Sequence, residues 1–76
     1  MPNSLTEILD AGVAFAAEYD GKYYLRPAKL ESHWDSTVWV YDKQTGSIEY
    51  MSYPVYIIEK YDLATEIDPE TIRKCS

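Results

Sequence analysis

An Asp-Gly pair at residues 20 and 21 constrains the fold of this chain more than any other local feature. Asp-Gly is a favoured two-residue turn between antiparallel strands, because both positions tolerate a positive φ. The pair divides two strand-like segments, Val13–Tyr19 and Lys22–Pro27. The sequence therefore predicts a tight β-hairpin over these residues.

The length of this turn also fixes which residues of the hairpin oppose one another. On one face we expect three pairs: Tyr19 with Lys22, Ala17 with Tyr24, and Phe15 with Arg26. On the other face we expect Ala14 with Pro27, Ala16 with Leu25, and Glu18 with Tyr23. Proline has no N–H to donate, so the second strand is expected to end at Pro27 or to lie at an edge.

A second hairpin is predicted over residues 36–51. Residues 36–42 alternate β-branched and aromatic side chains, residues 43–46 suit a type I turn with a glycine bulge, and residues 48–51 return. This register sets one face as Trp39 against Tyr50 and Tyr41 against Ile48. The other face is then Val38 against Met51 and Val40 against Glu49.

Helical signals flank the hairpins. Ser4 and Glu7 form a capping box before a helix over residues 5–11, whose Leu5, Ile8 and Leu9 share one side. Asp68 and Pro69 are typical of a helix start and predict a last helical segment ending near Cys75.

Residues 52–67 are ambiguous. Residues 55–58 have strand composition, whereas Ser52 and Pro54 suit a helix start. We favour a helix because the apolar residues Val55, Ile58, Tyr61, Leu63 and Ala64 roughly keep a 3.6-residue period. A helix would also carry Glu59, Asp62 and Glu66 on one outer face.

Together these elements predict a single α+β domain over residues 1–76. We expect a small antiparallel sheet of about four strands in two hairpins, with an N-terminal helix and a C-terminal helical segment. The second hairpin is apolar on both faces, which is unusual for a one-sided sheet. Either the helical segments divide between the two faces, or an aromatic face stays exposed as a contact site. The possible dimer face comprises Trp39, Tyr41, Ile48 and Tyr50.

Little in the chain suggests catalysis. There is one His, one Cys and no glycine-rich loop, so we expect neither an enzyme nor a cofactor. Glu31, His33 and Asp35 alternate and could share one side of an extended segment, but no second His or paired Cys supports a metal site. We therefore predict no metal.

Charge and tyrosine content point to binding instead. The net charge of −6 argues against direct contact with nucleic acid and suits a protein partner with a basic surface. Five acids stand against one base between residues 59 and 70, interleaved with some of the eight tyrosines. A solvated helix face that only aids solubility is the simpler interpretation of the same charges. The predicted partner-binding residues are Glu59, Asp62, Glu66, Asp68, Glu70, Tyr50, Tyr53, Tyr56 and Tyr61.

Nothing in the chain resembles a signal peptide or a membrane-spanning segment, so we expect a cytoplasmic protein with no membrane contact. In size and charge the chain resembles small acidic proteins of phages and mobile elements, such as anti-CRISPR, anti-restriction and toxin-immunity proteins. That resemblance implies an acidic inhibitor that blocks a basic nucleic-acid-binding surface of a partner. The alternatives are a self-associating protein with an aromatic dimer face, and a small ligand-binding domain that uses His33.

Overall fold

The computed structural model describes residues 4–28 and 37–75. Within these residues there are three short helices and a five-stranded antiparallel sheet, so the fold is α+β. The elements in chain order are α1 (Leu5–Ala11), β1 (Val13–Tyr19), β2 (Lys22–Pro27), β3 (Thr37–Asp42), β4 (Ile48–Ser52), α2 (Tyr53–Glu59), β5 (Thr65–Ile67) and α3 (Pro69–Cys75).

The sheet has the strand order β4-β3-β2-β1-β5, so the first four strands form a meander and β2 is the central strand of the sheet. The chain then leaves β4 at one edge, passes through α2 along one face, and adds β5 at the opposite edge, antiparallel to β1. This fifth strand is not predicted by the sequence pattern, because three residues are too few to show an alternation.

Both predicted hairpins are present, and their registers are almost entirely as expected. Trp39 pairs with Tyr50, Ala17 with Tyr24, and the turn at residues 20 and 21 adopts positive φ at both positions. The expected pairing of Ala14 with Pro27 is wrong. Pro27 pairs with Val13 instead, since an irregularity between Val13 and Phe15 inserts one extra residue into β1.

The first and last helices begin where the capping residues predict. The Ser4 hydroxyl accepts a hydrogen bond from the Glu7 backbone N–H, and the Asp68 carboxylate accepts one from the Glu70 N–H at 2.9 Å. An ion pair between Arg73 and Asp10 then joins α3 to α1.

The helix that we favour within residues 52–67 is present, but it is shorter than expected and buries a different side. It ends at Glu59, and a turn leads into β5, so Glu59, Asp62 and Glu66 do not share a helix face. Its buried residue is Tyr56, whereas Ile58 is 82% exposed. The reason is that the Tyr56 ring reaches Phe15 and Tyr24 on the sheet and buries more apolar area than a valine or isoleucine there.

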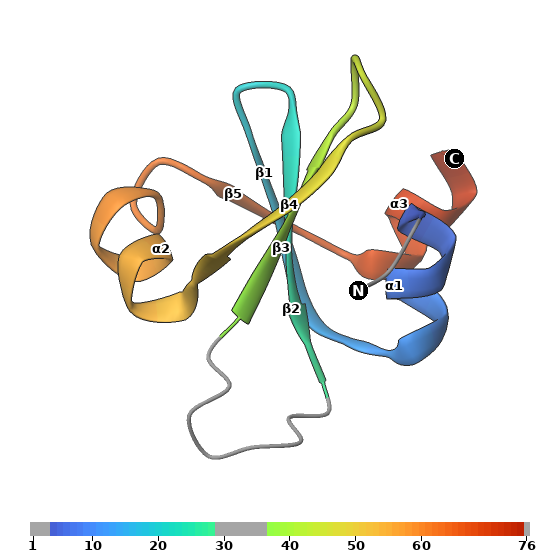
Figure 1. Ribbon diagram of the computed structural model, residues 1–76, viewed down its shortest axis with the longest axis horizontal. Helices are drawn as coiled ribbons and strands as arrows, with labels where there is room; N and C mark the ends of the chain where they lie inside the picture. Colours follow the sequence, from blue (N-terminus) through green and yellow to red (C-terminus); the bar gives the residue numbers. More distant parts are fainter. Residues whose placement is uncertain (1–3, 29–36, 76) are drawn as a thin grey trace.

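The helices divide between the two faces of the sheet, as Figure 1 shows, with α1 and α3 on one side and α2 on the other. Each side has its own apolar core, so both faces of the second hairpin pack against apolar side chains, although Tyr50 stays exposed. The α1/α3 core is built on Leu5, Ile8, Leu9, Ala16, Leu25 and Ile72. The α2 core is built on Tyr24, Val38, Val40 and Tyr56.

Two further expectations concern membrane contact and metal binding. In the part of the chain that is described, no helix is long and apolar enough to cross a membrane. The candidate ligands Glu31, His33 and Asp35 lie outside the described residues.

Candidate functional site

An open hollow of about 570 Å³ lies on the α2 side of the sheet, beneath the turn that follows the helix. Its volume falls within the usual span of ligand pockets, about 300–1,000 Å³. Strand β1 and the continuous segment from α2 through the turn to β5 line it. The lining residues are Phe15 and Ala17 of β1, Tyr53 and Tyr56 of α2, Tyr61, Asp62 and Ala64 of the turn, and Glu66 of β5.

The sheet register places Glu66 at this hollow. Residues paired across neighbouring strands carry their side chains on the same face, and Glu66 pairs with Ala17. The same row continues through Tyr24 and Val40 to Glu49 at the opposite edge. Because Ala17 contributes only a methyl group to the row, space remains beside Glu66 that a larger side chain would fill.

Aromatic rings form the inner wall of the hollow. The Tyr56 ring lies 5.9 Å from that of Phe15 and 5.6 Å from that of Tyr24. The Tyr53 ring stacks on that of Tyr56 with centroids 6.3 Å apart and 19° between planes. Rings that support one another in this way are held rigid, so a ligand would meet a preformed surface.

The charged groups that line the hollow are acidic. Asp62 and Glu66 are both exposed, and neither Lys nor Arg is among the lining residues that the structure describes. Burial raises the pKa of the Tyr56 phenol, and the neighbouring Tyr53, Tyr24, Tyr61 and Glu66 raise that pKa further. The phenol therefore stays neutral at physiological pH, and the net charge at the hollow comes from the two carboxylates.

The guanidinium of Arg26 already lies against one ring of this aromatic wall, that of Tyr53. The Arg26 guanidinium carbon lies 3.8 Å from the centroid of the Tyr53 ring, a close cation–π contact. Its Nη1 atom is buried and has no hydrogen-bond partner among residues 4–28 and 37–75. Lys60 holds a similar, looser position, with Nζ 5.3 Å from the centroid of the Tyr19 ring.

A second, shallower hollow of about 430 Å³ adjoins the first and shares Phe15 and Glu66 with it. Asp68 and Pro69 line its other end, at the start of α3. Glu66 thus stands between the two hollows, and Asp62, Glu66 and Asp68 follow the course of β5 along one edge of the sheet.

The predicted partner-binding residues are therefore only partly brought together. Tyr53, Tyr56, Tyr61, Asp62 and Glu66 meet at the larger hollow, and Asp68 borders the smaller one. Glu59 and Glu70 are exposed at the end of α2 and the start of α3 and line neither hollow. Tyr50 lies on the opposite face of the sheet.

Phe15, Ala17 and Ala64 line the site, although the sequence analysis did not single them out. A usable signal exists for one of them. Ala17 is a small residue opposite a large one, because its register partner Tyr24 is known once the hairpin turn is recognised.

The proposed dimer face lies at the β3–β4 end of the sheet, on the side of α1 and α3. Tyr50 is 66% exposed, and the Trp39 ring meets it edge-on at 5.9 Å. Tyr41 and Ile48 are half-buried next to them, and the Tyr41 ring stacks on that of Tyr23. Four of the molecule's larger apolar side chains thus form a continuous, incompletely covered surface.

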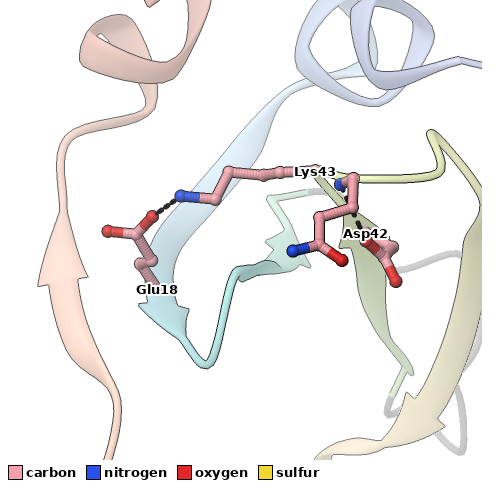
Figure 2. Close-up of polar contacts among 4 residues, drawn as sticks. Glu18, Asp42 and Lys43 are labelled. Carbon is pink, nitrogen blue, oxygen red and sulfur yellow. Dashed lines mark hydrogen bonds and ion pairs between the residues drawn. The ribbon is translucent and has the colours of Figure 1, made fainter.

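A polar clamp borders this face. Figure 2 shows Lys43 reaching from the second hairpin turn to an ion pair with Glu18 of β1, while Asp42 accepts a hydrogen bond from the Gln44 backbone N–H. The Lys43 ammonium also lies 4.9 Å from the centroid of the Tyr23 ring. The ion pair joins the ends of the two hairpins beside the aromatic face.

In the part of the chain that is described, no three His, Cys, Asp or Glu side chains are grouped so that they could hold a metal ion. Comparison with known proteins assigns no family. No protein-family model matches the chain, and no curated protein or solved structure matches it either.

Proposed function

We propose that this protein is a non-catalytic binding module whose acidic, tyrosine-rich surface around α2, the following turn and β5 binds a basic surface of a partner protein. The observation that carries the proposal is one hollow at which Tyr61 and Asp62 of the turn and Glu66 of β5 meet the aromatic side chains of α2 and β1. Charge of one sign beside rigid aromatic area favours both fast encounter and specific contact.

Exposed apolar side chains next to these acids support the same proposal. Ile58 is 82% exposed, Tyr61 59% and Leu63 56%, all on α2 or the turn that follows it. A protein interface commonly combines such apolar contacts with a charged rim. In its most specific form, the proposal is an acidic inhibitor of the anti-CRISPR, anti-restriction or immunity type that occupies the nucleic-acid site of its partner.

The test is capture of a partner from an extract of the source cells, with two variants of equal charge. Asp62→Asn/Glu66→Gln neutralises two acids at the hollow, and Asp20→Asn/Glu49→Gln neutralises two acids away from it. We expect wild type and the second variant to retain the same protein, and the first variant to lose it. Capture should also weaken as the salt concentration rises from about 0.05 M to about 0.5 M, because screening shortens the reach of exposed charges.

Equal retention by all three chains, or retention that does not respond to salt, would contradict the proposal. Identification of the retained protein then decides its most specific form. A nucleic-acid-binding partner that releases its nucleic acid when the chain is added supports the inhibitor, and a partner that keeps its nucleic acid excludes it.

A homodimer is the second candidate, and the exposure of Tyr50 beside Trp39 favours it. The strand β4 is also an edge strand, and edge strands pair readily across a two-fold axis. Sedimentation at micromolar concentration tests this version. We expect Tyr50→Ser to lower the dimer fraction, and a wild-type chain that is monomeric throughout would rule the dimer out.

A further inference from the structure

We propose that the larger hollow is a receptor for an arginine side chain of the partner protein, whose guanidinium would lie against the tyrosine wall between Asp62 and Glu66. This inference deepens the proposed function and rests on it, because it names the chemical group through which the basic partner is held. Three observations support it: the composition of the walls, the placement of the charges and the behaviour of the protein's own arginine.

The walls suit a flat cation. Tyr53, Tyr56 and Tyr61 line the hollow, and aromatic rings attract cations through the negative charge of their faces. A guanidinium is planar and weakly hydrated, so it can stack on a ring while its edge donates hydrogen bonds. An ammonium group is more strongly hydrated and has no plane to stack, which favours arginine over lysine here.

The carboxylates of Asp62 and Glu66 are placed to accept hydrogen bonds from the edge of the guanidinium. Asp62 comes from the turn above the hollow and Glu66 from β5 beside it, so two carboxylates approach one space from different elements. Carboxylates bind a guanidinium with paired hydrogen bonds in a fixed geometry. The floor is formed by the small side chain of Ala17, which leaves the space open.

Arg26 shows that this aromatic cluster accepts a guanidinium. Its guanidinium carbon lies 3.8 Å from the centroid of the Tyr53 ring. Arg26 itself does not line the hollow, so it leaves the two carboxylates there available to another cation. An arginine from the partner would therefore make the same kind of guanidinium–tyrosine contact that Arg26 makes. It would also bind the two carboxylates.

The test uses the purified chain and small probes, and it does not depend on knowing the partner. The probe is arginine blocked at both ends, which mimics a residue within a protein, and its neutral isostere is blocked citrulline. We expect blocked arginine to shift the backbone NMR signals of Ala17, Ala64 and Glu66 with millimolar affinity. Blocked citrulline, which has the same shape without the charge, should not bind.

Variants locate the binding. Asp62→Asn/Glu66→Gln should weaken blocked arginine by about tenfold, the size expected from losing charge-assisted contacts. Tyr61→Leu keeps an apolar side chain but removes the ring, and it should weaken binding several-fold. Asp20→Asn/Glu49→Gln is the matched control, since it neutralises two acids that do not line the hollow, and it should bind like wild type.

Free arginine, which keeps its own ammonium and carboxylate groups, tests whether the guanidinium belongs to a protein side chain or to the amino acid as a metabolite. The proposal expects it to bind no more tightly than the blocked form, because only the guanidinium is held and the added ammonium and carboxylate cancel in charge. Tighter binding of the unblocked amino acid would overturn the proposal in favour of a metabolite site. Equal binding of citrulline and arginine, or unchanged affinity in Asp62→Asn/Glu66→Gln, would overturn it as well.

These outcomes are distinct from failure of the proposed function. A chain that ignores blocked arginine but loses its partner in Asp62→Asn/Glu66→Gln still binds a basic partner, only not through an inserted arginine. A chain that binds blocked arginine at the hollow, yet captures its partner independently of these two acids, keeps the arginine site and contradicts the proposed docking surface.

Discussion

Tyr56 is the residue on which the α2 side of the molecule is built. Only 2% of its surface is exposed, and its ring contacts those of Phe15, Tyr24 and Tyr53. The same ring forms part of the hollow that we propose as the binding site. A single side chain therefore links the stability of the α2 core to the shape of the candidate site.

Burial of Tyr24 and Tyr56 predicts loss of stability at alkaline pH. Burial raises the pKa of both phenols above the ordinary value of 10.0. The unfolded chain then ionises them at a lower pH than the folded chain does. The free energy of unfolding should keep this contribution below pH 10 and lose it as the pH rises through the raised pKa values.

Urea unfolding between pH 8 and pH 11, a rough working range set by the ordinary tyrosine pKa of about 10, measures this effect. Tyr56→Phe removes one of the two buried phenols, so its free energy of unfolding should depend less on pH than that of wild type. Tyr50→Phe alters an exposed ring and is the matched control. A wild-type stability that is constant across this range would contradict the prediction.

Among the elements, α2 is the helix whose buried side differs from the one that its aliphatic residues predict. The aliphatic positions Val55 and Ile58 suggest a buried stripe, yet Tyr53 and Tyr56 face the sheet. Both stripes are apolar, and seven residues hold only two turns, so periodicity alone does not distinguish them. The aliphatic stripe is consequently left at the surface, where it borders the proposed interface.

Two substitutions in α2 test this orientation. Tyr56→Ala should lower the free energy of unfolding by about 3–5 kcal/mol, as for other large aromatic residues removed from a core. Ile58→Gln should change it by no more than about 0.5 kcal/mol, as for exposed positions in general. Urea unfolding measures both, and a larger loss for Ile58→Gln than for Tyr56→Ala would show that the helix has the opposite phase.

The whole molecule is one sheet with an apolar core on each side. The α1/α3 core and the α2 core share the strands β1, β2 and β3, because neighbouring residues of a strand point to opposite faces. Ala16 and Ala17 are such neighbours, and so are Tyr24 and Leu25. Neither core can be dismantled without losing the strands on which the other depends.

This sharing predicts a single cooperative unfolding transition. Leu25→Ala removes a fully buried side chain from the α1/α3 core and should cost about 2–5 kcal/mol. The far-ultraviolet signal of the backbone and the near-ultraviolet signal of the aromatic rings should then shift together, although most clustered tyrosines lie on the α2 side. Transitions that separate in this variant would show that the two cores unfold independently.

The sequence by itself determines the local elements and their pairing. The turn at residues 20 and 21, the capping residues Ser4 and Asp68, and the alternation in the second hairpin all act over a few neighbouring residues. Such short-range preferences can be interpreted without the rest of the fold, and the structure confirms the elements that they predict.

Only the tertiary structure decides the strand β5, the phase of α2 and the composition of the candidate site. The strand is too short to show a pattern, and it forms because β1 offers an unpaired edge. Tyr56 rather than Ile58 is buried because Phe15 and Tyr24 lie opposite it on the sheet. These outcomes depend on contacts between residues distant in sequence, so the packing of the whole chain settles them.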